Sequence, residues 1–174
     1  MMNDAIEIVS PLGRLTLRAE RTGDRSFLYG LFCDSRLPEW ETMQLDPALR
    51  EQLMQHQFRA QTTSYRAQFP KARFDIIELD GTAIGRIVVD RPGDMVHIVD
   101  QAIVPAMRNR GIGTAMMRAL MDEAAQAGLS VRLKVASSND PSMRLYLRLG
   151  FVPVETAPLY IDMEWCAPAT AADG

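Results

Sequence analysis

Residues 108–114 read Arg108-Asn109-Arg110-Gly111-Ile112-Gly113-Thr114 and join a predicted strand directly to a predicted helix. Glycines in such a turn let the backbone pass close to a ligand. The amides at the start of the helix, with the helix dipole behind them, form a site for an anion such as a pyrophosphate. The alternative is a tight loop whose glycines serve only the turn, because short glycine motifs also match by chance.

Two nucleotide-binding motifs do not fit this turn. A P-loop requires Gly-Lys-Ser/Thr, and no lysine lies here. A dinucleotide fingerprint requires a third glycine, where Met116 stands, and a preceding parallel βαβ unit. The preceding strands instead read as a hairpin, since Asp80-Gly81 separates two apolar runs.

Apolar periodicity on both sides of the turn predicts one central sheet with helices. Strands are predicted at residues 12–19, 74–79, 83–90, 95–104, 131–136, 151–156 and 159–165. Helices are predicted from Asp24, from Asp46-Pro47 to before Pro70, at 111–127 and at 141–149. This order gives an α/β (α+β) layout in a single domain over residues 1–166. Residues 167–174 read as a flexible tail.

Charge and composition exclude several function classes. The 174 residues carry a net charge of −3, and the 19 basic residues are scattered arginines apart from Lys71 and Lys134. We therefore expect no nucleic-acid partner. No window approaches the roughly 20 apolar residues that a membrane helix needs. Met1 to Ser10 do not read as a signal peptide, so we expect a cytoplasmic protein with no membrane partner.

The two cysteines predict no special chemistry. Cys33 and Cys166 lie far apart and lack the spacing of metal ligands. We expect reduced thiols, no metal site and no covalent enzyme intermediate.

Two motifs carry a family resemblance. Arg108-x-x-Gly111-x-Gly113 resembles the signature Gln/Arg-x-x-Gly-x-Gly/Ala of the GNAT (N-acetyltransferase) superfamily, which holds the pyrophosphate of coenzyme A. The segment Asn139-x-x-Ser142-x-x-Leu145-Tyr146-x-x-x-Gly150-Phe151 is similar to a second family motif, in which alanine stands where Ser142 stands here. The resemblance covers Phe74 to Trp165, and before Phe74 only the order of elements agrees.

The resemblance implies a GNAT-like fold, with a mixed, mostly antiparallel sheet of about seven strands and helices on both faces. Acetyl-CoA, the implied cosubstrate, would lie in the gap between the fourth and fifth strands. In the family a bulge of the fourth strand lies where Ala102 to Val104 lie here, and its amides would contact the pantetheine and stabilise the oxyanion. The implied cofactor-binding residues are Ala102, Ile103, Val104, Arg108, Asn109, Arg110, Gly111, Ile112, Gly113, Thr114, Asn139 and Tyr146.

Acyl transfer from a thioester to an amine requires a neutral amine and a proton for the departing thiolate. Tyr146 matches the family tyrosine that faces the sulfur, so it is the candidate general acid. The alternative is a core aromatic that packs against Leu149 and Phe151. His97 and Asp100 are both candidates for the general base. Alternation places these two on opposite faces of a regular strand, unless a bulge intervenes.

These observations predict an N-acetyltransferase that moves an acetyl group from acetyl-CoA to a small-molecule or peptide primary amine by direct attack in a ternary complex. Two alternatives remain open. One is a non-catalytic CoA-binding sensor or scaffold. The other is an interaction protein that uses the final strand, Tyr160 to Trp165, as a pairing edge. That strand also predicts a homodimer, because an exposed edge invites pairing.

Overall fold

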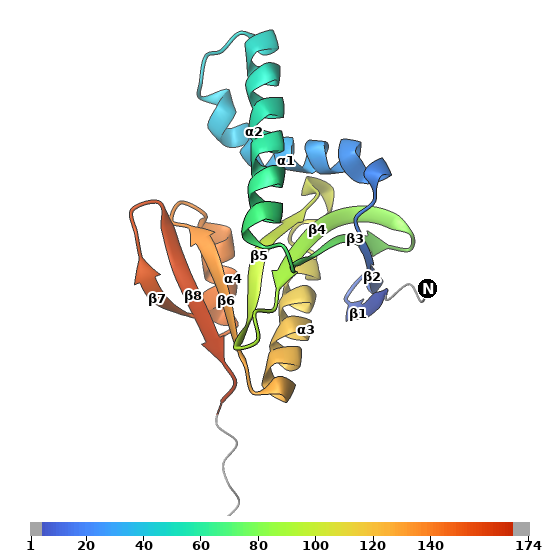
Figure 1. Cartoon of the computed structure of the whole chain (residues 1–174), viewed down its shortest axis with the longest axis vertical. Coiled ribbons are helices and arrows are strands. Elements are labelled where there is room, and N and C mark those ends of the chain that lie inside the picture. The colour runs from blue at the N-terminus through green and yellow to red at the C-terminus, as the bar shows by residue number, and fades with distance from the viewer. Residues whose placement is uncertain (1–4, 169–174) are drawn as a thin grey trace, which may run out of the picture.

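The computed structural model of the protein describes residues 5–168. Its centre is an open eight-stranded sheet in the order β1-β2-β3-β4-β5-β6-β8-β7 (Figure 1). The strands are β1 Ile6–Ser10, β2 Gly13–Ala19, β3 Arg73–Leu79, β4 Thr82–Asp90, β5 Met95–Ile103, β6 Ser130–Ala136, β7 Val152–Thr156 and β8 Tyr160–Cys166. Residues 169–174 of the predicted tail lie outside the described residues.

The helices begin and end where the sequence supplies capping residues. They are α1 Arg25–Glu41, α2 Pro47–Gln68, α3 Ile112–Ala127 and α4 Asp140–Arg148, with short 3-10 turns η1 Thr22–Asp24 and η2 Pro105–Met107. The Asp46 carboxylate accepts hydrogen bonds from the amides of Ala48 and Leu49 at the start of α2. Gly128 ends α3 in the left-handed conformation, at φ +68°.

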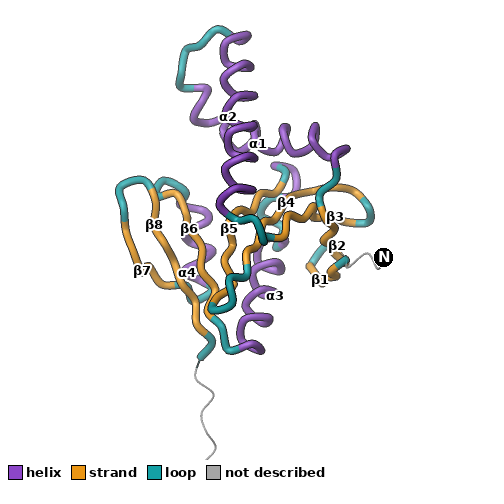
Figure 2. The backbone as a smooth tube through the Cα atoms, viewed as in Figure 1, coloured by secondary structure: helices purple, strands orange, loops and turns teal. Residues whose placement is uncertain are grey.

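Two hydrophobic cores hold these elements together. The main core lies between the sheet and α3, with side chains of α4 at its margin. Its fully buried members include Leu15, Ile77, Val96, Met116, Met117, Val131 and Met163. A smaller core joins α1 to α2 through Phe32, Trp40, Met54 and Phe58. Figure 2 shows α2 extending well beyond the sheet, so most of its stability comes from packing against α1.

The sheet opens between β5 and β6. These strands form the one parallel pair among the strands of residues 5–168, and only Met95–Ile98 pairs with Ser130–Leu133. The second half of β5 pairs with β4 alone, so its edge toward β6 has no neighbouring strand. This splay lies directly before the glycine turn and α3.

The sequence prediction missed β1 and misplaced the open edge of the sheet. β1 is short, and within it only Ile8 and Ser10 are buried, which gives little periodic signal. The predicted final strand, β8, is not an edge, because it pairs with β6 on one side and β7 on the other. The edge strand is β7, so the hypothesis that Tyr160 to Trp165 offer a pairing edge is wrong.

Candidate active site

The glycine turn presents the free amides of a helix N-terminus. Gly111 is the N-cap of α3 at φ +82°, and no side chain caps the helix. The first bond within the helix runs from the Ala115 amide to the Gly111 carbonyl at 3.0 Å. The amides of Ile112, Gly113 and Thr114 precede that bond and are therefore available to an anion.

The two glycines of the turn serve different purposes. A β-carbon on Gly111 would lie 2.8 Å from Pro11 Cγ, in the turn between β1 and β2, and the positive φ adds strain for any other residue. A β-carbon on Gly113 would lie 3.7 Å from Leu145 Cδ2 and 3.8 Å from Gln101 Nε2, which are ordinary contacts. Gly111 is thus required by the fold, whereas Gly113 leaves open space at the helix N-terminus.

Other predicted cofactor residues have structural contacts. Arg108 Nε donates to the Ile103 carbonyl at 2.9 Å, so this side chain fastens the turn to the end of β5. Asn109 adopts a left-handed conformation at φ +58°, and Arg110 is exposed. Asn139 Oδ1 accepts from the Ser142 amide at 3.3 Å and caps α4. The Ile112 side chain is buried, so it can offer a ligand only its amide.

The bulge of β5 lies earlier than Ala102 to Val104. Ala102 pairs with Arg86 and Ile103 with Gly85 in regular register. The irregularity falls at Val99, which is skipped in the pairing with β4. The expected position of the bulge is therefore wrong, because the irregularity lies three residues before Ala102. Ala102 and Ile103 nevertheless lie on the part of β5 beyond its pairing with β6, whereas the Val104 amide donates to the Ile84 carbonyl at 2.9 Å and is not available to a ligand.

The bulge places both candidate bases on one face of the sheet. Val88 pairs with Asp100 and Val89 with Ile98, so one extra residue separates the two pairs. Ile98 points into the core beneath α3. His97 and Asp100 therefore both point to the opposite face, although they are three residues apart. Regular alternation would have separated them.

Asp100 lies in the splayed half of β5, near charged and aromatic side chains. Its Oδ2 atom lies 3.9 Å from Arg86 Nε, and 28% of its side chain is exposed. Burial raises the pKa of the Asp100 carboxyl above its ordinary value, and the positive charge of Arg86 opposes that rise. Asp100 therefore accepts a proton more readily than an ordinary aspartate while staying within reach of solvent.

His97 lies at the closed end of the splay. It is opposite Arg132 in the paired part of β5 and β6, and its ring packs edge-on against Phe69 with centroids 5.3 Å apart. Burial lowers the pKa of His97, and the nearby Asp90 carboxylate partly opposes this. The imidazole is thus neutral near pH 7 and able to accept a proton, but it lies farther from the open part of the strand than Asp100.

Tyr146 has features compatible with both roles that the sequence left open. Its ring packs against Phe151 with centroids 5.8 Å apart and lies at the margin of the main core. Burial raises the pKa of the Tyr146 hydroxyl, and the charge of Asp100 raises it further. The hydroxyl therefore stays protonated at neutral pH, and the negative charge of Asp100 influences its pKa.

Sequence analysis missed the residues that surround Asp100. Arg86 is buried on β4, Glu20 follows β2, and Tyr65 lies on α2. Burial raises the pKa of Tyr65, and Asp100 contributes to this shift. One signal was present in the sequence: Arg86 interrupts the apolar run of β4, which is buried on both sides of it.

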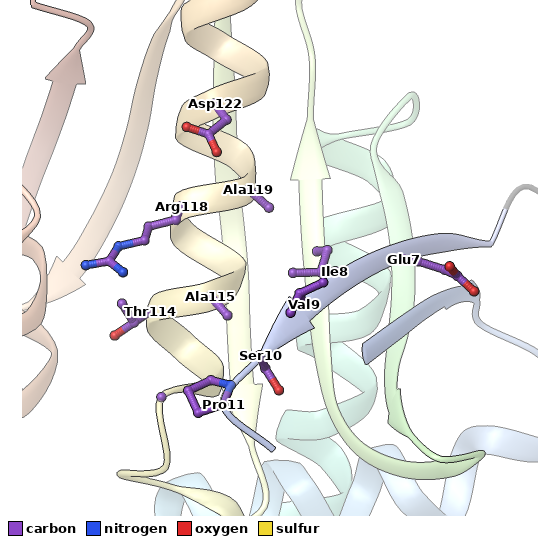
Figure 3. A pocket seen from close by; sticks show the side chains of 11 residues that line it. Glu7, Ile8, Val9, Ser10, Pro11, Thr114, Ala115, Arg118, Ala119 and Asp122 are labelled. Carbon is purple, nitrogen blue, oxygen red and sulfur yellow. The ribbon is translucent and has the colours of Figure 1, made fainter. Parts of the chain in front are cut away.

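A separate groove of about 540 Å³ lies between β1 and α3. Its lining is Glu7, Ile8, Val9, Ser10, Pro11, Gly111, Thr114, Ala115, Arg118, Ala119 and Asp122. Figure 3 shows Ala115 and Ala119 turned toward β1, whereas Arg118 extends away from it. The groove touches the glycine turn from the side opposite the β5–β6 splay, so it contains neither Asp100 nor Tyr146.

The described part of the chain offers no candidate for a membrane-spanning helix or for a metal cluster. No helix there is both long and apolar enough to cross a bilayer. Residues 5–168 contain no cluster of three or more potential metal-ligating His, Cys, Asp or Glu side chains. Cys33 and Cys166 are free thiols.

Comparison with known proteins agrees with this geometry. The model of the Acetyltransferase (GNAT) family matches residues 27–151. An N-alpha-acetyltransferase of Sulfurisphaera tokodaii is 31% identical over 104 residues, which are 52% of this chain and 62% of that protein. The chain thus aligns with less than two thirds of that relative.

Solved structures share the fold at low sequence identity. One is the PaiA N-acetyltransferase from Thermoplasma acidophilum in complex with coenzyme A, with a TM-score of 0.66 and 17% identity over 88% of this chain and 99% of that one. Another is the ribosomal-protein-S18-alanine N-acetyltransferase from Escherichia coli, with a TM-score of 0.59 and 18% identity over 91% and 99%. At these identities the likeness concerns the fold.

Proposed function

Because the chain belongs to the GNAT acetyltransferase family, we propose that it transfers the acetyl group of acetyl-CoA to a primary amine by direct attack in a ternary complex. One observation carries this proposal. The half of β5 that holds Asp100 has no neighbouring strand on its β6 side, and it leads through η2 into a glycine turn and an uncapped helix N-terminus. The thioester of acetyl-CoA would lie beside this half of β5, and its anionic pyrophosphate would lie at the N-terminus of α3.

The chain offers two sets of backbone groups to acetyl-CoA. The amides of Ile112, Gly113 and Thr114 would bind the pyrophosphate, since the N-terminus of α3 is positive and uncapped. The Val104 amide donates to the Ile84 carbonyl of β4, so alternation turns the Ile103 amide toward β6, where it would bind the pantetheine or polarise the thioester carbonyl. The PaiA N-acetyltransferase of similar fold was solved with coenzyme A, which supports this choice of cosubstrate.

We assign proton transfer to Asp100 and Tyr146. Asp100 accepts a proton from the acceptor ammonium, directly or through a water, and leaves a neutral amine. The amine nitrogen forms a bond to the thioester carbon, the carbon–sulfur bond breaks, and the Tyr146 hydroxyl gives its proton to the thiolate. The nitrogen, which carries a surplus proton after the attack, then loses that proton to the tyrosinate through water, which restores Tyr146 and leaves a neutral amide. The raised pKa values of both groups suit these roles, because Asp100 is a stronger base and Tyr146 remains protonated. His97 is the second candidate base.

The acceptor would approach from the face that carries His97 and Asp100, beside α1 and the end of α2. The similarity to an N-alpha-acetyltransferase makes peptide N-termini the first acceptors to test. An α-amino group has an ordinary pKa of about 7.7–8.0, against about 10.4 for a lysine side chain. A carboxylate base can therefore deprotonate an α-amine at neutral pH with a smaller energetic cost.

The test is a panel of acceptors read out by release of the CoA thiol. Peptides with free N-termini, the same peptides with blocked N-termini and an internal lysine, free amino acids and amine-bearing antibiotics would be compared. Turnover of one class with the parent protein, and its loss with Asp100→Asn, supports the proposal. Acetyl-CoA binding without turnover of any amine would instead favour the alternative of a CoA sensor or scaffold.

The pH profile identifies the base. If Asp100 is the base, kcat/KM rises with pH as its carboxyl ionises, and this limb lies above the pH at which an ordinary aspartate titrates because burial raises its pKa. The limb should disappear in Asp100→Asn and persist in His97→Gln. Persistence in Asp100→Asn and loss in His97→Gln would transfer the role to His97.

A further inference from the structure

Four charged side chains form a row on the acceptor face of the sheet. Arg66 Nη2 lies 2.8 Å from Glu20 Oε2, and Arg86 Nε lies 3.1 Å from Glu20 Oε1. At the far end, Arg86 Nε lies 3.9 Å from Asp100 Oδ2. The row therefore runs from an exposed arginine on α2 to the carboxylate that we assign as the base.

The middle of the row is buried and held in place by the sheet. Arg86 is 5% exposed and the Glu20 side chain 10%. The Glu20 amide donates to the Phe74 carbonyl at 3.0 Å, which fixes this residue to β3. The guanidinium of Arg66 lies 4.2 Å from the centre of the Phe74 ring. Phe74 thus holds the Glu20 backbone through a hydrogen bond and packs against the guanidinium of Arg66, the exposed ion-pair partner of Glu20.

The Arg86 guanidinium does not lie midway between the Glu20 and Asp100 carboxylates. Its Nε is closer to Glu20 than to Asp100 and makes no hydrogen bond. An arginine side chain remains charged even when it is buried. Whichever carboxylate holds the guanidinium has its negative charge neutralised, and the other keeps more of its affinity for a proton.

We propose that Glu20 is a positioning residue for Asp100: it holds the Arg86 guanidinium away from Asp100, so that the Asp100 carboxylate is free to accept a proton from the acceptor amine. This inference rests on the proposed function, which makes Asp100 the base. It adds a residue from the loop after β2, 80 positions away in the sequence, to the groups that set the rate.

Other charged and titratable groups also face Asp100. They are Arg86 on β4, Arg36 on α1, Tyr65 on α2, Tyr146 on α4 and, on the same strand face, His97. Burial is the largest influence on the pKa of Asp100 and raises it. Arg86, the Gln101 amide and Arg36 lower it, whereas Glu20 raises it. Removal of the Glu20 charge should therefore lower this pKa, both directly and through the release of Arg86.

The experiment measures the ionisation of Asp100 by two independent routes. Carbon-13 NMR follows the aspartate carboxyl signals with pH, and Asp100→Asn identifies the signal of interest. The acid limb of kcat/KM is measured with the best acceptor. In Glu20→Gln we expect both midpoints to move about one pH unit lower. A midpoint that stays in place or moves upward in the NMR titration would overturn the proposal.

Two further variants separate positioning from general damage. Arg66→Gln alters the exposed end of the row, and Arg66 is 53% exposed, so the fold should tolerate it. It leaves Glu20 with Arg86 as its partner in the row, and the Asp100 midpoint should move upward. Glu123 lies on α3, remote from this face. Glu123→Gln breaks its ion pair with Arg91 and should leave the Asp100 midpoint unchanged. Movement of the midpoint in Glu123→Gln, or a downward shift in Arg66→Gln, would contradict the role of Glu20.

The same data distinguish failure of this inference from failure of the proposed function. Loss of activity in Asp100→Asn, with no midpoint shift in Glu20→Gln, removes Glu20 and keeps Asp100 as the base. An acid limb that survives in Asp100→Asn removes Asp100 from the reaction. In that case the NMR titration still decides whether Glu20 controls the ionisation of Asp100.

Discussion

Val99 is the residue on which the geometry of the site depends. It is the extra residue of the β5 bulge; if β5 alternated regularly through Val99 instead, Asp100 would share the face of Ile98 and point into the core beneath α3. There a carboxylate would meet apolar side chains. With the bulge, Asp100 lies beside Arg86 and within the electrostatic influence of Tyr65 and Tyr146. The bulge at Val99 thus keeps the candidate base on the same face as His97.

The first prediction concerns Tyr146. Tyr146→Phe keeps the ring that packs against Phe151 and removes only the hydroxyl. If the hydroxyl protonates the thiolate, kcat should fall by about 10²–10⁴-fold, the usual contribution of general acid catalysis. Acetyl-CoA binding should change little, because in the proposed site the amides of α3 would hold the pyrophosphate. The measurements are kcat, the acetyl-CoA Kd and Tm on this single variant.

The competing interpretation of Tyr146 as a core aromatic gives the reverse pattern. It predicts a lower Tm with kcat nearly unchanged, because the hydroxyl would then matter only for packing. A kcat within about threefold of the parent corresponds to roughly 0.65 kcal/mol in the barrier. Such a value would remove Tyr146 from the mechanism.

The second prediction concerns Gly113, which is a cleaner probe than Gly111. Gly113→Val should abolish acetyl-CoA binding, because branched methyl groups would occupy the space beside the N-terminal amides of α3. The fold should survive, since a β-carbon here makes only ordinary contacts. Gly113→Ala is the matched control and should weaken binding less. A thermal shift with acetyl-CoA in Gly113→Val equal to that of the parent would argue against a pyrophosphate at this turn.

At the residue scale, the sequence named candidate groups but not their surroundings. Tyr146, His97 and Asp100 could be chosen from motif and strand position. The contacts of Asp100 with Arg86, and of Arg86 with Glu20, join separate elements. Non-local pairs of this kind leave no periodic signal along the chain. The sequence also could not show that a bulge at Val99 would override alternation.

At the scale of elements, local capping and turn signals were reliable. Asp46 caps α2, and Asp80-Gly81 forms the hairpin turn between β3 and β4, with both residues at positive φ. Strand neighbours were less predictable, because pairing depends on contacts distant in sequence. β8 was expected at the edge but lies inside the sheet. β7, which is exposed along its whole length, takes the edge position.

The third prediction concerns β7. This edge is blunted, because Pro153 has no amide to donate and the pairing with β8 is irregular there. The strand and the loop after it expose apolar side chains: Val152 is 57% exposed and Leu159 is 72% exposed. We therefore expect a homodimer that buries these side chains without a continuous strand ladder. Light scattering at tens of micromolar should give twice the mass of the chain.

A pair of charge substitutions locates that dimer contact. Val154→Lys should shift the mass toward the monomer. Val9→Lys, on the opposite edge strand β1, is the matched control and should leave the mass unchanged. A monomeric parent protein at these concentrations would contradict the dimer, and an effect of Val9→Lys alone would place the contact at β1.

At the scale of the whole molecule, the site lies where the two halves of the sheet diverge. β1 to β5 form one continuous antiparallel half, and β6, β8 and β7 form the other. They are joined by four parallel residue pairs and by α3, which packs on both β5 and β6. A ligand bound in the splay would contact both halves, and its binding energy would oppose their separation.

That arrangement leads to the last prediction, on the stability of the whole chain. Acetyl-CoA that binds only the native state at about 100 times its Kd should raise the free energy of unfolding by about 2.7 kcal/mol. NAD and ATP also carry pyrophosphate groups and should bind the N-terminus of α3, but they lack the pantetheine arm that would lie along Ala102 and Ile103. Their stabilisation at equal concentration should be clearly smaller. Denaturant unfolding with each ligand tests this directly. Equal stabilisation by all three would mean that the turn recognises only the pyrophosphate, and the splay of β5 from β6 would then have no part in binding.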